Sequence, residues 1–157
     1  MFNKYNKVRV NKGFTLIELM ITVAIVGILS VIAISSYSSH IAKANRAGAR
    51  TQLLQVAQFI QRFYVANDNY AASRDGSALL GAIPSSFMKS PSTGTPLYNL
   101  SIASITETDF TINMVPIAGS KMANDECGSF SINSLGVQSV LIGSTIGSQD
   151  LRDKCWK

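Results

Sequence analysis

The sequence has few residues of the types that carry chemistry. Its 157 residues include one histidine and two cysteines, and only 15% are charged. His40 has no partner motif, and the sequence has no metal-ligand spacing, nucleophile–base arrangement, phosphate-binding glycine loop or carboxylate pair. We therefore expect no enzyme activity, no cofactor and no metal, and the composition favours a structural or binding role.

Acidic residues are absent from the N-terminus. Four bases precede a long apolar run without an acid among them, namely Lys4, Lys7, Arg9 and Lys12. The formal net charge of +5 falls to +1 without residues 1–13, because ten bases then face nine acids. From residue 68 onward eight acids outnumber six bases. This balance disfavours a general nucleic-acid binder, whose affinity depends on neutralising phosphates.

A small-residue cleavage site is also missing after the apolar run, residues 14–34. The run is longer than the 7–15 apolar residues typical of a secretory signal. At 1.5 Å per residue it spans about 32 Å, which matches a hydrocarbon core of about 30 Å. The sequence therefore predicts a short basic leader (1–13), a retained membrane helix (14–34) with its N-terminus in the cytoplasm, and an external head (35–157).

The pattern of apolar residues predicts the fold class. Leu53, Val56, Ala57 and Ile60 follow helical spacing, so one helix is expected from about residue 14 to 66. A loop rich in Gly, Ser and Pro should follow, to about residue 96. Four runs with strand character come next, at 97–103, 109–115, 128–134 and 137–143. We expect an α+β fold in which an antiparallel sheet packs one face on the helix.

The two cysteines, Cys127 and Cys155, lie near the C-terminus. An even number beside an export-like N-terminus favours a disulfide formed outside the cytoplasm, and two free thiols are the alternative. In the chain-entropy model, closing a loop of this size stabilises the fold by about 3–4 kcal/mol.

Residues 12–29, "KGFTLIELMITVAIVGIL", resemble the leader and N-terminal helix of type IV pilins. The resemblance implies the type IV pilin fold, a long N-terminal helix on a C-terminal antiparallel sheet. It also implies that a prepilin peptidase cuts after Gly13 and N-methylates Phe14. The subunit would wait in the inner membrane, meet the assembly platform there and join other pilin subunits in an extracellular pilus (fimbrium). Many type IV pilins carry a helix-kinking proline where this chain has Ser35, so the usual kink is expected to be weaker.

Glu18 acquires a role through the same resemblance. A carboxylate inside a membrane segment costs about 2.5–3.5 kcal/mol on insertion scales. In pilins it is thought to pair with the N-terminal amine of Phe14 on a neighbouring subunit. The pairing would compensate the charge in the fibre and set the subunits in register. The alternative is a tolerated glutamate near a helix end.

The segments "NDECGSFSINSLGVQS" (124–139) and "DKCW" (153–156) resemble PilE-type minor pilins and ComP-like DNA-uptake receptors. This implies that Cys127 and Cys155 staple the C-terminal loop to the sheet, and that Trp156 is a packing residue. The expected function is a minor pilin that builds or primes a pilus for twitching motility, adhesion or DNA uptake. A DNA-binding receptor, a type II secretion pseudopilin and a bulk pilin are the alternatives. The candidate DNA contacts are Lys121, Arg152, Lys154 and Lys157.

Overall fold

The computed structural model describes residues 13–157, and the side chains of residues 31–36 lie outside that description. The predicted leader therefore lies outside the described residues except for Gly13. The chain divides into two compact units, one ending at Ser39 and the other running from His40 to Lys157. Each unit is described by itself, and the second carries the sheet.

Helix α1 runs from Leu16 to Asn67 without a break at Ser35, so the predicted long helix is confirmed. Its start is fixed by a capping box between Thr15 and Glu18. The Glu18 backbone N–H donates to the Thr15 hydroxyl (3.3 Å), and the Thr15 backbone N–H donates to the Glu18 carboxylate (2.9 Å). This reciprocal pairing satisfies donors that a helix N-terminus otherwise leaves open.

The first unit exposes its apolar side chains. Leu16 is 77% exposed, and ten other large apolar side chains are each more than half exposed, namely Phe14, Ile17, Leu19, Met20, Ile21, Val23, Ile25, Val26, Ile28 and Leu29. Within the part of the chain that was searched, no helix reaches both the length and the apolarity that a membrane crossing requires. Residues 31–34 of the predicted span lie outside the described side chains.

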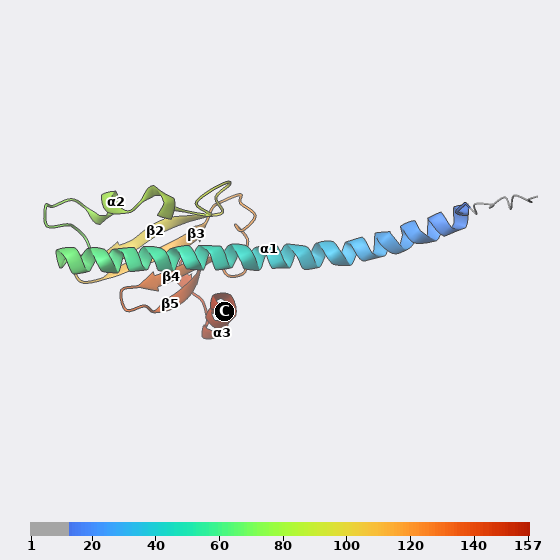
Figure 1. Ribbon diagram of the computed structural model, residues 1–157. Coiled ribbons are helices and arrows are strands. Elements are labelled where there is room, and N and C mark those ends of the chain that lie inside the picture. Colours follow the sequence, from blue (N-terminus) through green and yellow to red (C-terminus); the bar gives the residue numbers. More distant parts are fainter. Residues whose placement is uncertain (1–12) are drawn as a thin grey trace, which may run out of the picture. The chain divides into compact units, whose positions relative to one another are not determined.

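The second unit contains one six-stranded antiparallel sheet in which every strand pairs with its sequence neighbour (Figure 1). The four predicted strands are confirmed as β2 (Tyr98–Ile105), β3 (Phe110–Pro116), β4 (Ser129–Asn133) and β5 (Gln138–Ile142). Two more strands extend the edges, β1 (Lys89–Ser90) and β6 (Thr145–Ile146). With two residues each, they are too short to show an alternating pattern.

The core lies between one face of the sheet and the second half of α1. Leu53, Val56 and Ile60 are fully buried on the helix side. Alternate strand residues meet them from the sheet, including Phe110, Ile112, Met114, Phe130, Ile132 and Val140. The predicted packing is confirmed, and the intervening strand positions must face away from α1 because side chains alternate along a strand.

The segment predicted as loop (67–96) contains more structure than expected. Besides β1 it holds α2 (Leu79–Ala82) and the 3₁₀ helix η1 (Ser85–Phe87). Leu79 is buried, and the Gln52 side chain on α1 donates to the carbonyls of Ser86 (2.8 Å) and Lys89. Tertiary contacts with α1 thus accompany short elements that the local sequence pattern does not predict.

The last helix, α3 (Gln149–Trp156), was not predicted either. Ser148 caps it, because its hydroxyl accepts a hydrogen bond from the Leu151 backbone N–H (3.3 Å). The helix ends beside the second half of α1 in the same unit, where Arg50 reaches its C-terminal carbonyls.

Candidate functional site

Three bases recur along the second half of α1, at Lys43, Arg46 and Arg50. Residues three and four apart share a helix face, so all three point the same way. They meet the end of α3 and the segment before β4 around a hollow of about 270 Å³. The lining consists of Lys43, Arg46, Arg50, Glu126, Lys154, Cys155 and Lys157. We call this the basic hollow.

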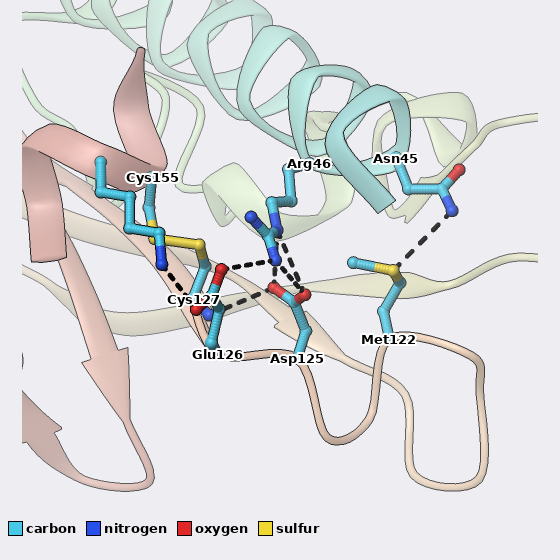
Figure 2. Close-up of polar contacts among 8 residues, drawn as sticks. Asn45, Arg46, Met122, Asp125, Glu126, Cys127 and Cys155 are labelled. Atoms are coloured by element: carbon cyan, nitrogen blue, oxygen red, sulfur yellow. Dashed lines mark hydrogen bonds and ion pairs between the residues drawn. A yellow bond between two sulfur atoms is a disulfide. The ribbon is translucent and has the colours of Figure 1, made fainter. Parts of the chain in front are cut away.

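The Cys127–Cys155 disulfide supports one side of the basic hollow, as the sequence predicts (Figure 2). Both half-cystines are buried, with Cα atoms 5.8 Å apart. The bond joins α3 to the segment just before β4. It therefore holds Lys154 and Glu126 close to each other.

Arg46 is the best-anchored base. Its guanidinium forks onto the Asp125 carboxylate, with Nη2 2.6 Å from Oδ1 and Nε 3.0 Å from Oδ2. Nη2 also lies 3.2 Å from Glu126 Oε1, and the Lys154 ammonium lies 2.7 Å from Glu126 Oε2 (Figure 2). The hydrogen bond to Asp125 raises the pKa of Arg46, and the bond from Lys154 lowers the pKa of Glu126.

Arg50 fastens the end of α3. Its Nη1 donates to the carbonyls of Cys155 (3.0 Å) and Lys157 (2.6 Å), while its buried Nε has no hydrogen-bond partner among the described residues. Burial, followed by the nearby charge of Arg46, lowers the pKa of Arg50. The charge of Arg46 is already paired with Asp125 and Glu126, whereas Arg50, in the described part of the chain, meets only backbone carbonyls and so leaves a net positive charge between α1 and α3.

The predicted DNA contacts are only partly brought together. Lys154 and Lys157 line the basic hollow, whereas Arg152 forms an ion pair with its neighbour Asp153 (2.8 Å). Lys121 is exposed and does not line the basic hollow. The three α1 bases were missed, although their spacing on one helix face was readable in the sequence.

Trp156 contributes packing. Its ring meets Phe130 edge-on, with centroids 5.6 Å apart, and its Nε1 donates to the Ser139 carbonyl (3.0 Å). Within residues 13–157 no three His, Cys, Asp or Glu side chains gather in a way that could hold a metal ion. The basic side chains around the basic hollow are suited to an anionic ligand.

A family model described as "Type IV minor pilin ComP, DNA uptake sequence receptor" matches residues 35–131, well over half of the chain. The chain belongs to this minor pilin family. A second model, the prokaryotic N-terminal methylation motif, matches residues 8–34 of this minor pilin. Together the two matches confirm the resemblance found in both halves of the sequence.

Curated relatives match mainly through a short segment. The minor pilin is 43% identical over 61 residues to the type IV major pilin protein PilA of Myxococcus xanthus strain DK1622, covering 39% of this chain and 28% of PilA. It is 67% identical over 33 residues to the fimbrial protein EcpB of Eikenella corrodens, covering 21% of each. The minor pilin thus spans about a quarter of the length of such relatives.

Solved structures show weaker likeness. The non-core minor pilin PilV of Neisseria meningitidis aligns with 68% of this chain and 93% of its own, at a TM-score of 0.47 and 17% identity. A type IV pilin from Shewanella oneidensis aligns with 69% and 99%, at a TM-score of 0.42 and 21% identity. The fold class of this minor pilin rests on its own helix and sheet.

Proposed function

We propose that this minor pilin is a structural subunit of a type IV pilus. Its apolar helix would make the contacts with other subunits in the fibre. The observation that carries the proposal is the family match, together with the exposed large apolar side chains on the described part of α1 in the first unit. Side chains of this kind need lipid or other apolar helices around them. The subunit would reside in the inner membrane as a single-pass protein and then move into the extracellular fibre.

The processing and assembly steps of the proposal concern three residues. Prepilin peptidase would cut after Gly13, and Phe14 would become the methylated N-terminus. The exposed positions of both residues are compatible with enzyme access. Glu18 would exchange its capping hydrogen bond from Thr15 for the Phe14 amine of a neighbouring subunit, which supplies a positive charge as well as a donor.

Deleting only this gene and counting surface fibres by electron microscopy tests the structural role. Bald cells support a subunit that primes or builds the pilus at the assembly platform. Complementation with Glu18→Gln keeps a capping side chain and removes the charge. Fewer fibres from that variant, with normal protein levels, support the Phe14 pairing. Normal fibres with a secretion defect would instead point to a type II secretion pseudopilin.

DNA binding is a second proposed function, favoured by the basic hollow and by the receptor named in the family description. Lys43 and Lys157 are exposed at its rim, while Arg46 and Arg50 are held below them by protein partners. A phosphate backbone crossing α1 and α3 would meet the two lysines first. They, with Lys154, therefore replace Lys121 as the contacts we expect to matter most.

Binding of the full chain to duplex DNA over a series of salt concentrations tests this second function. Each lost phosphate contact should reduce the slope of log K against log salt by about 0.9. The double variant Lys43→Ala/Lys157→Ala should therefore lower the slope by about two. Arg62→Ala, an exposed base elsewhere on α1, is the matched control. No detectable binding at low salt, or equal slopes for all variants, would reject DNA binding at this hollow.

A further inference from the structure

The face of the sheet turned away from α1 is polar. Because alternate residues of β2 to β5 pack into the core, the residues between them share this outer face. The strand register places Ser101 opposite Asn113, Asn113 opposite Ser131 and Ser131 opposite Ser139. A continuous row of hydroxyl and amide side chains therefore crosses four strands.

A hollow of about 310 Å³ lies over this row, which we call the sheet hollow. Its volume is at the lower end of the range for small-ligand sites. Five neutral polar residues and four aliphatic residues line it, and none of them is charged. They are Ala103, Thr111, Asn113, Ser131, Asn133, Val137, Ser139, Leu141 and Ile146.

Asn113 distinguishes the sheet hollow from an ordinary hydrated sheet surface. The residue is only 8% exposed, and its Oδ1 atom has no hydrogen-bond partner among the described residues. A buried acceptor without a donor destabilises the fold, so natural structures rarely keep one without a reason. Here the acceptor belongs to a residue that lines the sheet hollow, and it lies just beneath the surface, so a small turn of the amide would present it to a ligand.

Asn133 supplies a donor at the same hollow. Its Oδ1 accepts hydrogen bonds from the backbone N–H groups of Leu135 (3.1 Å) and Val137 (2.9 Å). These two bonds fix the orientation of the amide and leave Nδ2 available to donate. The hollow thus offers a fixed donor, a buried acceptor and the hydroxyls of Ser131 and Ser139.

We propose that the sheet hollow binds a neutral saccharide unit. Sugar hydroxyls can donate to Asn113 Oδ1 and accept from Asn133 Nδ2, while the C–H face of the ring packs on the exposed aliphatic side chains of Val137 and Ile146. An anionic ligand finds no cation in this lining. A purely apolar ligand would leave the Asn113 acceptor unpaired.

The sheet hollow shares no lining residue with the basic hollow. Binding of a saccharide there can therefore be tested separately from binding of DNA at the basic hollow. Loss of either one leaves the lining of the other unchanged.

Saturation-transfer NMR on the full chain, in a zwitterionic detergent without sugar groups, tests the proposal. The probes are the methyl glycosides of glucose, galactose, mannose, N-acetylglucosamine and N-acetylgalactosamine. Glucuronate and glucose 6-phosphate are the charged comparators. We expect transfer to at least one neutral glycoside and weaker transfer to both charged sugars. No transfer to any neutral probe, or stronger binding of the charged sugars, overturns the proposal.

Two variants locate the binding. Ala103→Phe fills the hollow from an exposed rim position, and Asn113→Leu removes the buried acceptor. Each should weaken binding by about tenfold or more. Asn99→Phe is the control. Asn99 lies on the outer face of β2, as Ala103 does, but outside the lining, so this variant should bind as the unmodified chain does.

Asn113→Leu also separates a ligand role from a structural one. Because it removes an unpaired buried acceptor, the variant should unfold at the same temperature or a higher one. A lower unfolding temperature would mean that Asn113 supports the fold, and Ala103→Phe would then decide the matter alone. Unchanged saccharide binding by Ala103→Phe would overturn the proposal.

Discussion

Helix α1 carries two different surfaces along one continuous backbone. In the first unit its apolar side chains are exposed all round, with Leu16 at 77% and Leu19 at 61%. In the second unit a narrow stripe faces the sheet, and Leu53, Val56 and Ile60 are fully buried. The second half finds its apolar partners within its own chain. The first half finds none among the described residues of its unit, and under the proposed function other chains or lipid would supply them.

The largest expected difference between the two halves comes from removing one leucine from each. Leu53→Ala should lower the free energy of unfolding of the head by about 2.7–5 kcal/mol, because it leaves a cavity in the core. Leu19→Ala, at an exposed position, should change it by no more than about 0.5 kcal/mol. Urea unfolding in detergent, followed by tryptophan fluorescence, measures both. Equal losses would contradict the division of the helix into a self-packed half and a partner-dependent half.

Loss of the disulfide is expected to rank next. The Cys127→Ser/Cys155→Ser variant opens a link across a sequence separation of 28, worth about 3–4 kcal/mol in the chain-entropy model. The loss should appear in the unfolding of the head, while the helical circular dichroism of the folded full chain in detergent stays the same. Reducing the unmodified chain should give the same loss. If the variant unfolds like the oxidised chain, the bond does not stabilise the fold.

Arg46 should matter less than the disulfide and more than its neighbour Lys154. Its partner Asp125 has only 7% of its side chain exposed, and in Arg46→Ala this carboxylate keeps the hydrogen bond from the Cys127 backbone N–H but loses its ion pair. The variant should therefore cost about 1.5–3 kcal/mol. Lys154→Ala removes a base whose side chain is 59% exposed, and should be close to neutral. Thermal unfolding of the two variants side by side measures the difference. Similar losses would show that burial does not set the strength of this network.

The smallest effect concerns acid. Since the pKa of Glu126 is lowered in the fold, its contribution is present above the ordinary value of 4.5 and is lost as the pH falls through the folded value. Glu126→Gln cannot titrate at this position. On acidification from about pH 6 to about pH 3, the unmodified chain should lose more stability than Glu126→Gln. A steeper loss in the variant would reverse the assigned sign.

The long elements of this fold follow from residue patterns alone. The stripe at Leu53, Val56 and Ile60 predicts the buried helix face, and the alternation in β3 predicts which residues enter the core. The disulfide follows from the cysteine count and the export-like N-terminus. These features were predictable because each follows from a hydrophobic periodicity or a residue count that can be read directly from the sequence.

The remaining elements depend on distant contacts. β1 pairs because β2 lies beside it, and the Gln52 side chain on α1 donates to the Lys89 carbonyl of β1. In the basic hollow, the three α1 bases could have been grouped by their spacing. Their proximity to Lys154 could not be predicted, because it depends on where α3 lies in the fold. The acceptor of Asn113 is also invisible in the sequence, since its isolation depends on the neighbouring strands.

The sequential order of the six strands has a consequence for synthesis. Each strand can pair with the strand made just before it, so the sheet can form hairpin by hairpin as the chain is produced, with mostly local contacts. Cys155 lies in α3, after the last strand. Covalent closure must therefore wait until every strand has been made. Oxidation of this pair therefore records that all six strands have been made.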